Sequence, residues 1–251
     1  DAKLYKFVME DNPYLPKDYI DWIKRMYAPG TIWHSRFILG EWSSAEGRVF
    51  PFFDRSKNVI KVEELPDTYR YYILSVDYGI SNPFAAVLWG LRDNTWYIIR
   101  EFYYDSRKEG RQLLNSDYIR RLADMCIINN TKIFPEILVP PEEPEFIKEL
   151  RRSPFNQIQH VKAANNEILP GIADLSSLLY SGQLKISEEC ETCIWGLEEL
   201  VWDVKACEAG RDMYEKGGSG SPDHICDALR YGARDALKHL RMMREGRYDT
   251  Y

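Results

Sequence analysis

The chain has 251 residues, 45% of them hydrophobic and 29% charged, so it can form one large domain, or one domain with an appendage, around a sizeable core. Its 33 Lys and Arg against 39 Asp and Glu give a formal net charge of −6, which excludes a basic surface overall and restricts any nucleic-acid contact to local patches. The longest apolar run, residues 84–91, is far shorter than the roughly 20 residues that cross a bilayer, and the first residues lack a signal-peptide core; we therefore expect a soluble intracellular protein without membrane contact.

The five cysteines are an odd number in a chain without an export signal, which favours reduced thiols over a disulfide framework. Cys190 and Cys193 have the spacing of half a zinc site, but no second pair completes it. We interpret the cysteines as small core residues.

Residues 1–67 differ in composition from the rest of the chain. Turn-forming residues lead into a predicted helix that continues to about Tyr27 and that residues 28–30 end. Prolines, tryptophans and other aromatics are frequent here, as in an arm that packs on something larger. The polar segment 63–67 marks the predicted boundary, so residues 68–251 form the main domain.

Three antiparallel strands are expected to open the main domain. Residues 71–77 are rich in β-branched and aromatic side chains, and the apolar run 84–91 follows after a turn. A polar turn then leads into a third strand at 96–104. Because sequential strands joined by short turns usually pair, a meander is the economical interpretation.

Helices and strands alternate after the meander. The predicted elements are a helix from Ser116, a good N-cap, to 128, a strand at 132–139, a helix at 142–152, a short strand at 158–161, and helices at 168–180 and 188–201. This order predicts an α/β fold with a mixed sheet flanked by helices.

A long amphipathic helix is predicted near the end of the chain. Ser221 and Pro222 supply an N-cap and a proline suited to the first turn, so the helix begins in register at Asp223. Its small and apolar residues share one side, which suits close packing on a sheet. His224 and Asp227, three positions apart, share the polar face.

Asp77 and Asp227 are the carboxylates best placed for chemistry. Asp77 ends a core strand at the rim of the sheet, where Gly79 lets a substrate backbone approach. Alternatively, Asp77 merely starts the turn before Gly79. Asp227 also fits a solvated charge paired with Arg230 or Tyr231 on an outer face. For Asp223 we prefer the simpler interpretation, a carboxylate that complements the helix dipole.

Five segments together resemble a known family in their order and spacing. They are Leu74–Gly79, Ser81–Ala85, Trp202–Lys205, Asp223–Tyr231 and Arg36–Trp42. Over about residues 35–235 the chain resembles the nuclease domain of the terminase large subunits of tailed bacteriophages or prophages. The last of the five segments resembles the one that leads out of the ATPase motor in these proteins.

The resemblance implies a ribonuclease H-like fold that cuts double-stranded viral DNA during genome packaging, in the cytoplasm of the bacterial host. It implies that Asp77 and Asp227 hold two Mg²⁺ or Mn²⁺ ions, with His224 beside the metals, where it could orient a ligand or a water. A core or rim histidine without a catalytic role fits the same position. Hard cations take carboxylate oxygens, and two ions about 3.5–4 Å apart can activate a water and stabilise the leaving oxygen of a phosphodiester. The implied partners are the ATPase domain of the same full-length protein, the portal and the small terminase subunit.

One position departs from the family pattern. The family places an Asp after the strand at 132–139, whereas this chain has Pro140, which cannot bind a metal. Glu142 or Glu143 could supply the missing carboxylate from the next turn, or the site could hold one ion well and be slow or inactive. Both glutamates also precede a predicted helix, where acidic side chains complement the helix dipole without any catalytic role.

DNA contact requires local patches of Lys and Arg. The candidates are Arg107, Lys108, Arg111, Arg151, Arg152, Lys162, Arg211 and Lys216. The glycines at 217–220 give the loop that follows Lys216 the freedom to gate access to Asp227, although a flexible linker fits as well. The chain contains no phosphate-cradling motif for ATP.

The leading hypothesis is a metal-dependent and largely sequence-nonspecific endonuclease, because nothing resembles a recognition helix or a zinc finger. The first alternative is a catalytically impaired module that docks DNA or the portal, with Pro140 as the mark of lost activity. The second is another nuclease of the same fold, such as a junction resolvase or a transposase.

Overall fold

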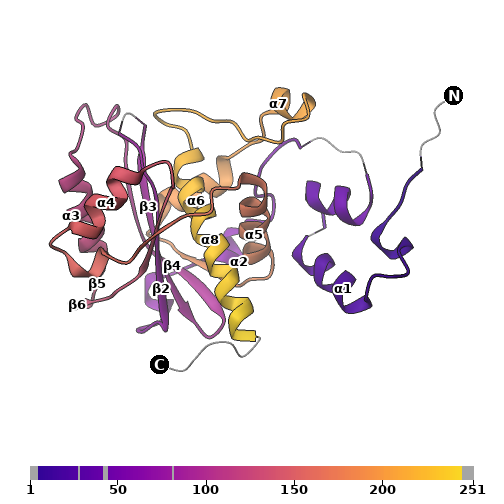
Figure 1. Ribbon diagram of the computed structural model, residues 1–251, viewed down its shortest axis with the longest axis horizontal. Helices are drawn as coiled ribbons and strands as arrows, with labels where there is room; N and C mark the ends of the chain where they lie inside the picture. Colours follow the sequence, from indigo (N-terminus) through magenta and orange to yellow (C-terminus); the bar gives the residue numbers. More distant parts are fainter. Residues whose placement is uncertain (1–4, 28, 42–44, 81, 245–251) are drawn as a thin grey trace.

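A computed structural model describes residues 5–27, 29–41, 45–80 and 82–244 (Figure 1). Three residues named in the predictions, Ala28, Trp42 and Ser81, lie outside the described residues. So do residues 1–4 of the predicted arm and residues 245–251 of the predicted main domain. In the described part of the chain no helix is both long and apolar enough to span a membrane.

The centre of the fold is a mixed sheet of seven strands in the described residues. In spatial order these are β1 (Val59–Ile60), β9 (Leu184–Ser187), β4 (Thr95–Tyr104), β3 (Phe84–Arg92), β2 (Tyr71–Asp77), β7 (Glu136–Val139) and β8 (Val161–Ala163). The pairs β2–β3 and β3–β4 are antiparallel, as predicted, and the outer strands pair in parallel. The predicted fold class is confirmed.

Helices cover both faces of the sheet (Figure 1). One face carries α5 (Ile168–Tyr180), α6 (Glu191–Glu199) and α8 (Asp223–Arg244), and the other carries α3 (Asn115–Met125) and α4 (Pro144–Arg152). Successive strand residues point to opposite faces, so Ile73 packs under α8 in one core while Leu74 packs in the other. Two apolar cores therefore enclose the sheet.

The predicted helix α8 begins at Asp223 and packs very closely on β3, as its small residues predicted. A Cβ added at Gly232 would lie 2.6 Å from Cζ2 of Trp89 and would overlap other indole atoms. The Trp89 indole donates a hydrogen bond of 3.0 Å to Ser75 on β2, so the surface on which Gly232 packs is held in place.

All five cysteines are buried free thiols, which confirms the prediction that they are core residues. Burial and the nearby carboxylate of Glu101 raise the pKa of the Cys193 thiol well above its ordinary value. The Cys193 thiol is therefore protonated and apolar in character.

Two predicted elements have different boundaries in the structure. Helix α3 begins one residue before Ser116, and its N-cap is Leu114, whose amide donates to the Asp117 carboxylate at 3.0 Å; the prediction that Ser116 is the cap was wrong. The predicted strand 132–139 is divided, because Asn129 and Asn130 adopt positive φ and turn the chain into a separate small hairpin. Its strands are β5 (Ile127–Ile128) and β6 (Thr131–Lys132).

Strand β9 was missed because it has only four residues and directly follows α5. The strand predicted at 158–161 is a 3-10 turn, Asn156–Ile158, followed by β8. Helix α6 is shorter at both ends than the predicted 188–201. The remaining short helix of the C-terminal half is α7 (Val204–Glu208).

The first part of the chain contains α1 (Lys17–Met26), short turns at Met9–Asp11, His34–Ile38 and Val62–Glu64, and α2 (Arg55–Asn58). Figure 1 shows α1 set apart from the sheet, on the side of α5. Trp33 nevertheless packs on Trp202 with 6.4 Å between ring centroids, and Arg36 forms a bidentate ion pair with Asp212. Trp33 and Arg36 thus attach the first part of the chain to the main domain, and β1 extends the sheet by pairing with β9.

Candidate active site

The C-terminal ends of β2 and β7 and the N-terminal end of α8 meet at one edge of the sheet. Because β2 and β7 are parallel, Asp77 and the turn after Val139 lie at the same edge. The predicted residues Asp77, Glu142, Glu143, His224 and Asp227 all line one cleft of about 450 Å³. Residues that are 150 positions apart in the sequence, Asp77 and Asp227, are therefore brought together, as expected.

Asp77 and His224 form a partly buried hydrogen-bonded pair. The distance from His224 Nδ1 to Asp77 Oδ2 is 2.9 Å. Burial raises the pKa of Asp77 to about 6, in spite of the hydrogen bond from His224 and with help from the nearby charge of Asp227. Burial alone would lower the pKa of His224, but the contact with Asp77 and the charge of Asp223 outweigh it, and the pKa rises. The pair therefore retains a proton to a higher pH than an isolated carboxylate does.

Asp227 is held on one side by a buried arginine. Its Oδ1 accepts hydrogen bonds from Arg230 Nε at 3.1 Å and Nη2 at 2.9 Å, and from the Tyr214 hydroxyl. Its Oδ2 lies 3.9 Å from the Lys216 ammonium. The pairing with Arg230 that the sequence suggested is present, but Asp227 is 7% exposed and Arg230 is 3% exposed, so it is not a solvated pair on an outer face.

Arg230 is itself fixed by the backbone before α5. Its Nη1 donates to the carbonyl oxygens of Asn166 at 2.9 Å and Glu167 at 3.1 Å. A glycine at position 171 makes this possible, because a Cβ there would lie 2.9 Å from the Arg230 Cδ and still nearer to its Cγ. The orientation of Asp227 thus depends on the packing of α5 against α8.

The turn after β7 places two carboxylates beside Pro140. Glu142 and Glu143 both line the cleft with this proline, which stands where the resemblance expected an Asp. Burial, reinforced by the charge of Glu142, raises the pKa of Glu143. Glu142 accepts a hydrogen bond from the Asn166 side chain. The turn therefore supplies acidic groups where the strand end has none.

Asp223 is a cleft residue that the sequence interpretation explained by the helix dipole. It is 3% exposed, and its Oδ2 accepts a hydrogen bond of 3.2 Å from the Gly217 amide. In the described part of the chain, neither its Oδ1 nor the Nε2 of His224 has a hydrogen-bond partner, and these two atoms lie 3.9 Å apart. Its place in the same helical turn as His224 was the signal that could have identified it.

A glycine-containing loop, residues 215–222, borders the cleft. Lys216 lines the cleft directly, and the Lys216 ammonium lies 5.5 Å from the centre of the Tyr214 ring. The loop is anchored by Asp105, which is 4% exposed and accepts hydrogen bonds from the Ser219 hydroxyl at 2.6 Å and from the Gly220 amide at 3.1 Å. The loop is thus tied to the end of β4.

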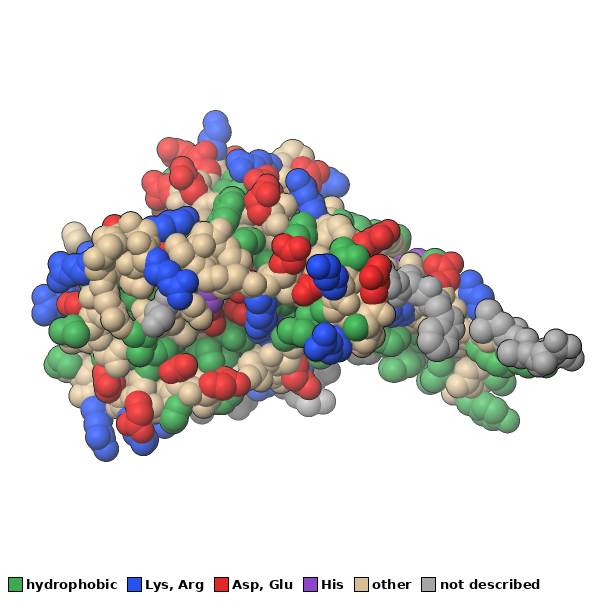
Figure 2. Space-filling model, turned by 90° about the horizontal axis from the view of Figure 1, so that it is seen from above, with side chains coloured by type: hydrophobic (Ala, Val, Ile, Leu, Met, Phe, Trp, Pro, Cys, Tyr) green, Lys and Arg blue, Asp and Glu red, His purple; other side chains and the backbone are tan. Residues whose placement is uncertain are grey.

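The predicted basic residues are divided between the rim of the cleft and more distant places. Lys216 lines the cleft, whereas Arg107 and Lys108 do not line it but lie against Gly218 and Gly220 of the neighbouring loop. The residues Arg111, Arg151, Arg152, Lys162 and Arg211 do not line the cleft. Acidic and basic side chains are interspersed over the face shown in Figure 2. This mixture agrees with the net charge of −6, which the sequence interpretation took to exclude a basic surface overall.

The donor set of the cleft suits a hard divalent cation. Carboxylates converge on it from the end of β2, from the turn before α4 and from α8, and the buried Asp223 Oδ1 has no hydrogen-bond donor among the described residues. Oxygen ligands of this kind favour Mg²⁺ or Mn²⁺ over softer metals. The residues present therefore fit a divalent metal centre.

No protein-family model matches the chain. The terminase large subunit of Escherichia phage T5 is 23% identical over 199 residues, which are 76% of this chain and 42% of that protein. The large terminase of a thermophilic bacteriophage, in a structure that contains ADP, is 33% identical, with a TM-score of 0.79 over 92% of this chain and 55% of that one.

The chain is thus similar to phage terminase large subunits over most of its own length. It spans about half the length of these two relatives. The large terminase nuclease of the thermophilic phage G20c, whose structure contains bound magnesium, shares the fold with a TM-score of 0.52 and 16% identity. This likeness extends over 96% of the G20c nuclease and 74% of our chain, so the chain has the ribonuclease H-like fold of these nuclease domains.

Proposed function

We propose that this terminase domain is a divalent-metal-dependent endonuclease that cuts double-stranded viral DNA during packaging, largely without sequence specificity. The observation that carries the proposal is the convergence of Asp77, Asp227 and the Glu142–Glu143 turn on one cleft. The magnesium bound by the G20c nuclease supports the same chemistry. The proposal for the ion is Mg²⁺ or Mn²⁺ in a two-ion site.

Asp77 and Asp227 would hold the ions, with Glu142 or Glu143 as the third carboxylate in place of the missing Asp at Pro140. When bound, two such ions supply an activated water and stabilise the leaving 3′ oxygen. Asp227 offers its Oδ2 to the cleft, because Arg230 and Tyr214 occupy its Oδ1.

His224 orients Asp77 through its Nδ1 and presents the opposite ring nitrogen, Nε2, which is without a hydrogen-bond partner among the described residues. That nitrogen can position a water or accept its proton. His224 is thus proposed as a catalytic group next to the metal ligands Asp77 and Asp227.

Phosphate contacts are proposed for the basic rim. Arg107, Lys108 and Lys216 lie beside the cleft, where they can bind the phosphates that flank the scissile bond. The more distant Arg151, Arg152, Lys162 and Arg211 would bind DNA that extends beyond the cleft.

The relatives support a place in a larger packaging protein. We assign residues 1–67 to an arm that links an ATPase domain to the nuclease domain at 68–251. The portal, the small terminase subunit and double-stranded DNA are the proposed partners, in the cytoplasm of the bacterial host.

The test is cleavage of supercoiled plasmid with Mg²⁺, with Mn²⁺ and with chelator. Asp77→Asn and Asp227→Asn should each abolish cleavage, and Asn at 227 retains an acceptor for Arg230, so the fold is preserved. Glu142→Gln combined with Glu143→Gln should lower the rate at least about tenfold. Glu145→Gln is the matched control, because Glu145 is an exposed neighbour that pairs with Lys148 at 2.7 Å. Full activity of Asp77→Asn or Asp227→Asn would contradict the assignment.

A second candidate, a DNA- or portal-docking module with impaired catalysis, is favoured by Pro140 in the wall of the cleft. A folded wild-type chain that binds linear duplex but leaves plasmid intact with both ions would support this candidate and refute the nuclease.

A further inference from the structure

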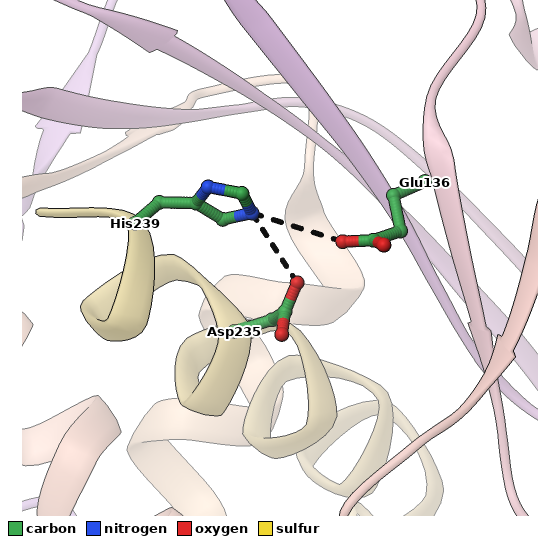
Figure 3. Close-up of side chains that lie close together, drawn as sticks. All are labelled: Glu136, Asp235 and His239. Carbon is green, nitrogen blue, oxygen red and sulfur yellow. Dashed lines mark ion pairs between the residues drawn. The ribbon is translucent and has the colours of Figure 1, made fainter. Parts of the chain in front are cut away.

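A second group of metal-ligating side chains lies away from the cleft, where α8 crosses the start of β7 (Figure 3). Asp235 and His239 are one helical turn apart on α8, and Glu136 is the first residue of β7. Each offers a ligand atom, and these three atoms all lie within 4.8 Å of one another. The cluster combines one imidazole and two carboxylates from two elements.

This cluster is separate from the candidate active site. Glu136 pairs with Ile73 in the sheet, four residues before Asp77 on β2, which corresponds to about 13 Å along the strand. Asp235 lies eight residues after Asp227, or about 12 Å along the helix. None of the three cluster residues lines the cleft that contains Asp77.

The three side chains point toward one another. His239 Nε2 lies 3.4 Å from Asp235 Oδ2 and 3.7 Å from Glu136 Oε2, the contacts drawn in Figure 3. The Tyr71 hydroxyl donates to Glu136 Oε2 at 3.2 Å, and the Tyr71 ring lies against the His239 ring with 4.1 Å between centroids. Tyr71 therefore fixes both a carboxylate and the imidazole, as the outer partners of metal ligands do.

The carboxylates of the cluster are buried without enough donors. The Glu136 side chain is 1% exposed and that of Asp235 is 19% exposed. The Lys162 ammonium is the close partner of Glu136 Oε1, and the buried Asp235 Oδ2 accepts no hydrogen bond within the described residues. Buried carboxylates are costly unless a cation or hydrogen-bond donors compensate them, so this arrangement favours a bound cation.

Lys162 is the group that now compensates Glu136. Its ammonium is in ion-pair contact with Glu136 Oε1, but the side chain is half-exposed. It also lines a cavity of about 420 Å³ that reaches Asp235 and gives an entrance from solvent. Arg234, which lines the same cavity, is paired with Asp174 and Glu167. Lys162 is thus a removable counter-ion at the entrance to the cluster.

We propose that Glu136, Asp235 and His239 bind one Zn²⁺ ion, which joins α8 to β7 and competes with the Lys162 ammonium. The imidazole nitrogen favours Zn²⁺ over Mg²⁺, which prefers oxygen ligands alone. Three protein ligands leave a fourth position for a water from the cavity side. The site is structural, and it is independent of the proposed nuclease activity.

The test is calorimetric titration of the full chain with Zn²⁺ alone, in an Asp77→Asn, Asp227→Asn background that removes two carboxylates of the cleft, the two proposed as ligands on β2 and α8. We expect one bound ion and a Zn²⁺-dependent rise in the unfolding temperature. His239→Gln should abolish both effects, whereas His160→Gln, at an exposed histidine outside the cluster, should leave them unchanged. Tyr71→Phe should weaken binding about tenfold.

Lys162→Gln retains all three ligands and keeps the proposal testable if the His239 variant is unfolded. It should tighten Zn²⁺ binding, because the competing ammonium is removed. Absence of Zn²⁺ binding in the background protein would overturn the proposal. Unchanged binding in folded His239→Gln, or weaker binding in Lys162→Gln, would do the same.

Discussion

Substitution of Gly232 by Ala tests how closely α8 is held on the sheet, because two effects of known size oppose each other. In a helix interior, Ala is favoured over Gly by about 1 kcal/mol. Against this, the new methyl group would stand 2.6 Å from Cζ2 of Trp89 and closer to other indole atoms, where carbon atoms normally lie about 3.5–4.0 Å apart. Helix or indole must therefore move by about 1 Å.

The indole of Trp89 has little freedom to move. It is fully buried, its Nε1 donates to Ser75 at 3.0 Å, and Trp96 packs edge-on against it with 6.4 Å between centroids. Overpacking of a core costs about 1–3 kcal/mol, and the upper part of this range applies where the neighbour is fixed. After subtraction of the helix-propensity gain, we expect Gly232→Ala to lower the free energy of unfolding by about 1–2 kcal/mol.

Urea denaturation of Gly232→Ala, of Trp89→Phe and of the double variant measures the effect. Phe at position 89 removes the indole atoms that the methyl group would overlap, so in that background the Ala substitution should be neutral or stabilising by up to about 1 kcal/mol. A single Gly232→Ala variant that is more stable than the wild type would refute the reasoning. It would mean that α8, and with it His224 and Asp227, is less closely packed than described.

Three further predictions concern other contacts. Glu101→Gln should lower the free energy of unfolding by about 1 kcal/mol in urea denaturation, because the Glu101 carboxylate accepts two hydrogen bonds of 2.7 Å from amides at the start of α6; no change would contradict this. Asp105→Asn should speed proteolysis within residues 215–222, because it weakens the anchor of Ser219 and Gly220; an unchanged cleavage rate would show that the loop is held elsewhere. Because the pKa of Asp77 is raised to about 6, its ligating anionic form is lost as the pH falls through 6, so Mn²⁺ affinity measured by calorimetry should fall with it; a pH-independent affinity between 5 and 7 would refute a role for Asp77 in metal binding.

The elements that the sequence predicted best are those whose ends carry a local signal. Strand β2 ends where Tyr78 and Gly79 interrupt its β-branched and aromatic run, and helix α5 ends where Ser181 and Gly182 form a turn; both have the predicted bounds. Strand β9 has no such signal, because its four residues become a strand only by pairing with β4. Tertiary pairing of this kind cannot be deduced from local preference.

The candidate site was predictable at positions where a carboxylate stands at the end of a predicted strand or in the first turns of a predicted helix. Asp77 and Asp227 stand at a strand end and in a helix turn, and both line the cleft. Arg230 was considered only as a surface partner, because its burial depends on the space left by Gly171 on another helix. The cluster around Glu136 was not foreseen, since its strand residue and its helix residues are about 100 positions apart and share no motif.

The ion pair between Arg36 and Asp212 gives the first part of the chain a mechanical connection to the cleft. Asp212 lies two residues before Tyr214, whose hydroxyl donates to Asp227, and four residues before Lys216. A force that displaces residues 34–38 is therefore transmitted through a few peptide units to the groups that restrain Asp227. The segment that precedes the sheet is thus anchored within two residues of a group that holds this carboxylate.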